Sequence, residues 1–410
     1  MLSNAKLKQY AKLLVEVGLN VQKGQPLVIS CPVDCAYFAR LCAEAGYEAG
    51  CKSVEMEWRD DALTRMKYLR ADDAVFDVCP PWRSAFRIEN ARAGAAFLSI
   101  HAEDPSLLAG VEPGRIQRAS RAAGAAMKEF HEGTMQNRFQ WCIGSIPVPS
   151  WAKTVFPELP EADAMARLWE RIFDAVRITD GGDAVAAWRS HIEQLTYYRT
   201  RLNELRFRAL HYQNALGTDL TVELPDGHFW AAGQENTQGG VPFVANMPTE
   251  EVFTAPKRDG VNGRVVASMP LVLDGNIVRD FALTLEAGRI VRVEAGEGQA
   301  LLEQATRLDE GAAYLGEAAL VPFDSPISNT KTLFYNTLFD ENASCHLAFG
   351  SAYPCIEGGD AMSEEERRSH GLNTSMTHVD FMIGTRDLSI TGLTADGREI
   401  PVFVQGNFAL

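Results

Sequence analysis

The sequence predicts an α/β protein in two parts: a Rossmann-like α/β domain over residues 1–200 and a mixed α+β, largely antiparallel domain over residues 201–410. In the first part, short apolar runs alternate with segments of helical periodicity, which is typical of βαβ units and a mainly parallel sheet. From about Leu205 onward, short strands are separated by tight turns, which indicates antiparallel pairing.

The elements of the first part follow from their side-chain patterns. Leu7, Ala11, Leu14 and Val17 share one helical face, and Gly18 then ends that helix. A short apolar run over 26–30 predicts a buried strand. The same alternation predicts helices over 34–46, around 115–136 and over 161–203 with a break near 180–182, and strands over 51–58, 95–101 and 141–148.

The elements of the second part are shorter and closer together. Strands are expected over 206–212, 220–224, 228–233, 263–272, 281–286 and 289–294, with turns at 217–219, 225–227, 274–276 and 287–289. Helices are expected over 299–309 and 363–368. Neither the glycine pattern of dinucleotide-binding folds nor the P-loop pattern occurs, so a nucleotide cofactor has no support in the sequence.

Composition narrows the classes of function. With 54 acidic and 39 basic residues, the formal net charge is −15. Such a field repels phosphate backbones, so nucleic acid is not an expected partner. No apolar run approaches the ~18 residues that cross a bilayer, and the N-terminus leads straight into an amphipathic pattern without a cleavage-type segment. The eight cysteines are expected to be free, reduced thiols. We therefore expect a soluble, cytoplasmic protein.

The segment T-H-V-D offers the first candidate site residues. Residues i and i+2 on a strand point to the same face, so His378 and Asp380 can converge on one metal ion or form an acid–base pair. By itself, an H-x-D pattern favours a plainer interpretation, a solvated edge strand with a surface contact between histidine and aspartate.

His346 and Tyr353 lie in a second segment, D-E-N-A-S-C-H-L-A-F-G-S-A-Y. Apolar and small residues surround His346, so it is either a core histidine with satisfied hydrogen bonds or a metal ligand whose other nitrogen is held by an acceptor. Tyr353 is either an ordinary half-buried tyrosine or, beside a cation, a donor to a developing oxyanion.

Two further segments supply carboxylates. Glu317 stands in the apolar run L-G-E-A-A-L-V, where an unpaired charge is costly. The first basic residue downstream is Lys331, so a metal is the simplest partner. Glu250 and Glu251 are adjacent, and neighbours on a strand face opposite ways, so one of them is expected to point inward. An exposed acidic pair is the alternative.

Together these residues suggest a metal site in the second part of the chain. Carboxylate oxygens and imidazole nitrogens without a thiolate suit zinc, cobalt or manganese in an open catalytic site. Carboxylates that bridge two ions are typical of dinuclear hydrolytic sites, with the metals about 3.5–4 Å apart.

Five segments of the chain resemble the thermophilic metallo-aminopeptidases, the aminopeptidase T and S group. They are N-M-P-T-E-E-V-F-T-A-P, L-G-E-A-A-L-V-P-F-D-S-P-I-S, the segment through His346 and Tyr353, H-V-D-F-M-I-G, and the N-terminal stretch from Tyr10 to Gln25. The resemblance runs in order from about residue 7 to the C-terminus.

The resemblance implies a cocatalytic site for two divalent metal ions, zinc, cobalt, manganese or magnesium, in a C-terminal catalytic domain, and it implies a homodimer. Carried over onto this sequence, Glu317 bridges the two ions and Tyr353 takes the position of the family's active-site tyrosine. Glu250 is assigned as general base only by analogy with other dinuclear peptidases. The full set of implied metal ligands is Glu251, Glu317, His346, His378 and Asp380.

We therefore expect a metallo-aminopeptidase that hydrolyses N-terminal residues from peptides with a free N-terminus, through a metal-activated water. Two alternatives stay open. One is a metal-dependent amidase or deacylase that acts on a non-peptide amide. The other is a non-catalytic α/β binding protein that keeps the fold.

Overall fold

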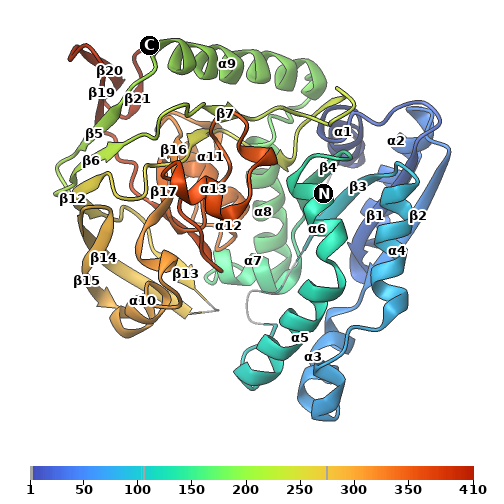
Figure 1. Cartoon of the computed structure of the whole chain (residues 1–410). Helices are drawn as coiled ribbons and strands as arrows, with labels where there is room; N and C mark the ends of the chain where they lie inside the picture. Colours follow the sequence, from blue (N-terminus) through green and yellow to red (C-terminus); the bar gives the residue numbers. More distant parts are fainter. Residues whose placement is uncertain (1–2, 103, 105–106, 274–275) are drawn as a thin grey trace. The chain divides into compact units, whose positions relative to one another are not determined.

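The computed structural model of the protein describes every residue except 1–2, 103, 105–106 and 274–275 (Figure 1). The turn predicted at 274–276 therefore lies mostly outside the described residues. The chain divides into two compact units, residues 1–190 with 234–248 and residues 191–233 with 249–410. The first unit contains a parallel sheet and the second contains antiparallel sheets, which confirms the predicted fold class.

A five-stranded parallel sheet organises the first unit, in the order β10-β4-β3-β1-β2. Helices cover both faces of such sheets, and accordingly β1 is buried almost throughout. The segment 234–248 supplies β10 and a small hairpin of β8 (Glu235–Asn236) and β9 (Pro242–Phe243). The strands of the parallel sheet are β1 (Pro26–Pro32), β2 (Ser53–Arg59), β3 (Ala96–His101), β4 (Trp141–Ser145) and β10 (Asn246–Met247).

Alternating strand residues decide which helix meets which face of this sheet. Leu27 of β1 meets Gly46 of α2, whereas Val28 and Phe97 pack against Phe130 of α6 on the opposite face. The helices that begin in this unit are α1 (Asn4–Leu13), α2 (Ala36–Glu48), α3 (Asp61–Arg70), α4 (Pro81–Arg92), α5 (Pro113–Ala126), α6 (Lys128–Met135), α7 (Pro149–Val155), α8 (Glu161–Ala175) and α9 (Ala184–Leu205).

The second unit has two antiparallel sheets that share one apolar core. Val265 and Leu283 enter this core from a nine-stranded sheet, and Leu347 and Phe381 enter it from a five-stranded sheet. The nine-stranded sheet contains β5 (Ala209–Gln213), β6 (Asp219–Glu223), β12 (Val261–Val266), β13 (Leu271–Leu273), β14 (Asn276–Glu286), β15 (Arg289–Glu297), β19 (Ser389–Leu393), β20 (Glu399–Val404) and β21 (Asn407–Phe408).

The five-stranded sheet of the second unit runs in the order β18-β17-β16-β11-β7 (Figure 1). Its strands are β7 (Ala231–Ala232), β11 (Val252–Thr254), β16 (Leu315–Leu320), β17 (His346–Gly350) and β18 (His378–Met382). The helices of this unit after α9 are α10 (Gln299–Ala305), α11 (Pro326–Asn329), α12 (Thr337–Asp340) and α13 (Glu364–Ser369).

Three predicted elements differ from the structure. The alanine-rich helix is two helices, because Met127 leaves the helical region at φ −97° and ψ 6°. The strand predicted over 263–272 is two strands, and Pro270 between them has no amide hydrogen for a sheet ladder. The strand predicted over 228–233 shrinks to β7.

Two general features bear on the class of protein. Among the described residues, no helix is long and apolar enough to span a membrane. All eight cysteines are free, and seven of them are buried.

Candidate metal centre

Strands of the five-stranded sheet position the five predicted metal ligands. Glu317 lies on β16, His346 opens β17, and His378 and Asp380 lie on the edge strand β18. Glu251 immediately precedes β11. All five residues belong to the second unit, and the structure brings them together.

The register of these strands directs the side chains to one face. Ala348 of β17 is the partner of both Glu317 and Asp380, and residues two apart on a strand share a face, so both histidines join them. The small side chain of Ala348 leaves space between the two carboxylates. Alternate residues, such as Leu347 and Phe381, point into the apolar core. The alternation that builds the core therefore also assembles the polar face.

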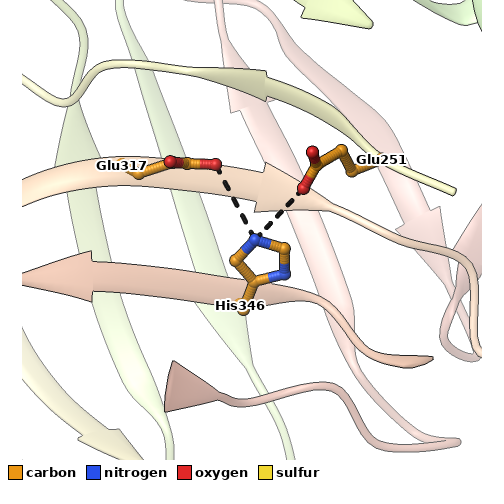
Figure 2. A group of neighbouring side chains, drawn as sticks. All are labelled: Glu251, Glu317 and His346. Carbon is orange, nitrogen blue, oxygen red and sulfur yellow. Dashed lines mark ion pairs between the residues drawn. The ribbon is translucent and has the colours of Figure 1, made fainter. Parts of the chain in front are cut away.

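Figure 2 shows the first group of ligands, in which Nε2 of His346 faces two carboxylates. This nitrogen lies 3.3 Å from Oε2 of Glu251 and 3.7 Å from Oε1 of Glu317. The side chain of His346 is only 1% exposed and that of Glu251 is 12% exposed. One atom from each of the three residues lies within 4.8 Å of the others, a spacing that lets a single ion contact all three.

A second group shares Glu317 with the first. Oε2 of Glu317 lies 3.1 Å from Nε2 of His378, and the same nitrogen lies 3.2 Å from Oδ1 of Asp380. Ligand atoms of these three residues also lie within 4.8 Å of one another. Glu317 thus offers one oxygen to each group, which is how a carboxylate bridges two metal ions.

Backbone carbonyls hold both histidines in the tautomer that a metal ligand needs. Nδ1 of His346 lies 3.0 Å from the carbonyl oxygen of Ser344, and Nδ1 of His378 lies 2.7 Å from that of Ser351. A carbonyl oxygen only accepts, so Nδ1 donates in each case and Nε2 faces the carboxylates. Metal-bound histidines usually have their second nitrogen fixed in this way.

In the absence of a metal, the carboxylates keep protons on the imidazoles. Burial would lower the pKa of His378, but Asp380 and Glu317 raise it to about 11. Burial would raise the pKa of Glu317, but hydrogen bonds from His346 and His378 lower it to about 2. The sequence next to Glu317 offers no Lys or Arg as a partner, and the imidazoles that lower its pKa come from strands distant along the chain.

One oxygen of the site has no satisfactory partner. Oδ1 of Asp380 is buried and makes no hydrogen bond of acceptable geometry, although Nε2 of His378 lies 3.2 Å away. Three carboxylates, two oriented imidazoles and this unsatisfied oxygen form a donor set that suits a divalent cation such as zinc, cobalt or manganese. The residues present therefore fit the metals that the resemblance implies.

Tyr353 lies beside the second group. Its ring is 5.3 Å from the ring of His378 in an edge-on arrangement and 5.5 Å from the ring of Phe253. The surrounding protein and the carboxylates of the site raise the pKa of the phenol well above its usual value, although the side chain as a whole is 39% exposed. The phenol is therefore a protonated donor at neutral pH that is open to solvent on one side.

Glu250 is buried but belongs to neither group of candidate ligands. Its side chain is 2% exposed, which is at odds with the alternative of an exposed acidic pair. One of its oxygens lies 3.6 Å from Nε2 of His191, and that nitrogen also lies 2.8 Å from the carbonyl oxygen of Thr249. The amide of Glu250 donates to Oδ1 of Asn342. These contacts direct Glu250 toward α9.

Glu341 is a site residue that the sequence interpretation did not single out. Burial and the charges of Asp380, Glu251 and Glu317 raise its pKa well above the usual value, against a lowering by His346. It opens a short 3-10 turn just before β17, where no strand or helix period signals its direction. The only available signal was its place five residues before His346 in the sequence.

Known proteins resemble this chain over nearly its whole length. A model of the family described as thermophilic metalloprotease (M29) matches residues 3–408. The chain is 47% identical to aminopeptidase AmpS of Bacillus subtilis (strain 168) and 42% identical to aminopeptidase T of Thermus aquaticus, and each match covers 98% of both chains. The solved structure of wild-type AmpT from Thermus thermophilus matches with a TM-score of 0.92 at 40% identity, over 99% of each chain.

Proposed function

The chain belongs to the thermophilic metalloprotease (M29) family, and from this premise we propose that it is a metal-dependent aminopeptidase that removes N-terminal residues from peptides. Its relatives over nearly the whole length are named aminopeptidases. The observation that carries the proposal is the pair of three-residue donor groups that share Glu317. A shared carboxylate of this kind suits two ions that act together on one substrate bond.

We assign the ligands to two divalent ions, zinc, cobalt, manganese or magnesium. Glu251 and His346 would hold one ion, His378 and Asp380 would hold the other, and Glu317 would be shared between them. When bound, such ions lower the pKa of a coordinated water from 15.7 toward about 7 and polarise a carbonyl oxygen. The backbone acceptors of the two histidines keep both Nε2 atoms directed at these positions.

The remaining residues of the site handle the substrate and its protons. Tyr353, with its protonated phenol beside His378, donates a hydrogen bond to the oxyanion that forms when the peptide carbonyl becomes tetrahedral. We expect a carboxylate to act as the general base that transfers the proton of the attacking water. Glu250 is the choice by analogy with other dinuclear peptidases, and Glu341 is favoured by its electrostatic interaction with the ligands themselves.

Two further expectations come from the sequence, the first from the family resemblance and the second from composition. We propose that the protein acts as a homodimer and that it works in the cytoplasm. Sedimentation equilibrium of the purified protein tests the first, with a mass of twice 45.1 kDa expected. Fractionation of cells that express the protein tests the second, with the peptidase activity expected in the soluble fraction.

Dialysis against a chelator, followed by addition of single metals, tests the proposed activity. Hydrolysis of unblocked peptides should disappear and should return with zinc, cobalt or manganese. The same peptides with an acetylated N-terminus should not be cleaved, because an aminopeptidase needs the free amino group. Cleavage that survives the chelator contradicts metal dependence, and equal cleavage of blocked peptides or simple amides favours an amidase.

A further inference from the structure

A small cavity in the first unit lies apart from the chemistry described so far. It has a volume of about 260 Å³ and lies on the face of the parallel sheet that α4 and α6 cover. All of its lining residues belong to the first unit, whereas the candidate metal ligands belong to the second. Most of its wall is lined by apolar side chains, called the apolar box below, and one end is lined by polar side chains.

Aromatic side chains form most of the apolar box. Phe97 of β3 packs edge-on against Phe130 of α6, with ring centroids 4.9 Å apart. Trp141 of β4 lies next to Phe97 in the register of the sheet, and Val28 of β1 lies on its other side. Met135 at the end of α6 is 59% exposed and forms part of the opening. A flat or branched apolar group of modest size fits such a lining.

Ser30 lies at the polar end and has no partner. The residue is 3% exposed, and its hydroxyl makes no hydrogen bond to any residue that the structure describes. In the sheet, Ser30 pairs with Ser99 of β3 on one side and with Glu57 of β2 on the other. Side chains at paired positions share a face, so the three polar groups form a row along the cavity. A buried hydroxyl without a partner is destabilising, and a ligand that bonds to it removes that cost.

An ion pair completes the polar end. Arg87 of α4 donates from Nε and Nη2 to the carboxylate of Glu57, with Nε 2.9 Å from Oε2. The guanidinium also lies over the ring of Phe130, 5.3 Å from its centroid. Among the described residues, no acceptor engages Nη1 of Arg87. The side chains of Arg87 and Glu57 are 24% and 28% exposed, so a positive and a negative group meet at the edge of an apolar box.

The polar end of this cavity lies near a switch point of the sheet, whereas Phe97 and Trp141 of the cavity lie at the amino ends of β3 and β4. The strand order β2-β1-β3-β4 reverses direction between β1 and β3, and α2 and α6 lie on opposite faces there. Ligands of open α/β sheets bind at such switch points, toward the carboxyl ends of the strands. Ser30 and Ser99 both lie in the carboxyl-terminal half of their strands.

We propose that this cavity binds a free α-amino acid with an apolar side chain. The ligand's carboxylate accepts from Nη1 of Arg87 and from the hydroxyl of Ser30, and its ammonium group donates to Glu57. Its side chain lies among Phe97, Phe130 and Trp141. A volume of about 260 Å³ is below the usual range for larger ligands, which favours a single amino acid over a peptide.

The proposed binding site consists of residues of this cavity alone and goes beyond the proposed peptidase function. If both hold, the ligand is also what the peptidase releases, and the first unit responds to the enzyme's own product. The two ideas are separable because a metal-free protein retains the cavity.

Equilibrium dialysis of radiolabelled L-leucine and L-phenylalanine against the chelator-treated full-length protein tests the proposal. We expect saturable binding of one molecule per chain. N-acetyl-L-leucine, which lacks the ammonium group, and L-leucinamide, which lacks the carboxylate, should each compete at least about tenfold more weakly, because each loses a charge-assisted hydrogen bond. Absence of binding at millimolar concentration, or equal competition by either analogue, would overturn the proposal.

Variants assign the binding to this cavity. Arg87→Gln should weaken L-leucine binding at least about tenfold, and Glu57→Gln provides a second, independent removal of one charge. Arg92→Gln is the matched control, because Arg92 lies on the same helix but pairs with Glu129 outside the cavity. Unchanged binding in both cavity variants would refute the site. The metal-loaded variants should hydrolyse peptides at the parental rate when the product concentration is low. If the parental protein itself shows no peptidase activity, the proposed function is refuted, but the binding of an amino acid to the cavity is not.

Discussion

The substitution Glu317→Gln removes one charge from the point where the two ligand groups meet. It keeps the size of the side chain and one oxygen acceptor, but it takes the negative charge away from both groups at once. The two oxygens of Glu317 lie 3.7 Å and 3.1 Å from the histidine nitrogens that complete those groups. The change therefore acts on both proposed ions and not on one.

The size of the effect follows from these distances. At about 4 Å and an effective dielectric constant of about 20, two unit charges interact by about 4 kcal/mol. Because a divalent ion carries two unit charges, the lost attraction is at least that size, which corresponds to at least a roughly 10³-fold weaker affinity for an ion, since each 1.4 kcal/mol is about tenfold. We therefore expect at most one tightly bound metal per chain in the variant. We also expect kcat/KM for an unblocked peptide to fall at least about 10³-fold.

Metal content by mass spectrometry and peptide hydrolysis, measured on the same preparation, form the assay. Glu286→Gln serves as the matched control, because Glu286 is an exposed glutamate at the end of β14. The melting temperature of the metal-free variant distinguishes a bridging role from a structural role less well. His346 and His378 pair with Glu317 even without a metal, and the loss of these ion pairs also lowers stability. A Gln variant that retains two metals and parental activity would refute the bridging role.

Three further predictions follow from the site and its surroundings. Tyr353→Phe should lower kcat by about 10²–10³-fold with metal content unchanged, and Tyr47→Phe, on an exposed tyrosine, should lower neither. Zinc binding to the metal-free protein should release protons and should tighten as pH rises, because the metal displaces protons from groups such as His378, whose pKa is raised to about 11. Calorimetry in buffers of different ionisation enthalpy measures the number of protons released. A number of zero would contradict this prediction. Burial raises the pKa of Asp340 from 3.8 to about 7, although hydrogen bonds from backbone amides oppose this rise. The folded state therefore binds more protons than the unfolded state, and the free energy of unfolding should fall as pH rises from about 4 to about 7. Asp340→Asn should remove that fall in denaturant unfolding of the metal-free protein, and an opposite slope would mean that the amide donors outweigh burial.

Local patterns were sufficient to predict part of the site. The two-residue period of a strand correctly placed His378 and Asp380 on one face of β18, with Oδ1 of Asp380 3.2 Å from Nε2 of His378. The apolar run around Glu317 predicted that its carboxylate would be buried, and Glu317 is 4% exposed. In both cases the relevant interaction is between neighbours along one strand, or between a strand and the core that it faces.

Long-range pairing set the rest of the site. The register that brings Ala348 opposite both Glu317 and Asp380 joins strands separated by about 30 residues each, and no local pattern specifies it. The resemblance to a known family supplied that arrangement. Glu341 was missed because a short 3-10 turn has no periodicity that indicates direction.

The fold was predictable to a similar degree. Alternating apolar and helical segments identified the parallel sheet of the first unit, since β1, β3 and β4 are local apolar runs. The division of the alanine-rich helix at Met127 was not predictable, because alanine before the break and lysine, glutamate and methionine after it all favour helix. The segment 234–248 also could not be assigned to the first unit from sequence, since its strand β10 is two residues long and depends on pairing with β4.

Anomalous scattering from crystals of the metal-loaded protein, collected on either side of the metal's absorption edge, tests the central claim most directly. The account predicts two peaks per chain about 3.5–4 Å apart, with Glu317 contacting both, Glu251 and His346 contacting one, and His378 and Asp380 contacting the other. A single peak, or two peaks of which Glu317 touches only one, would contradict it.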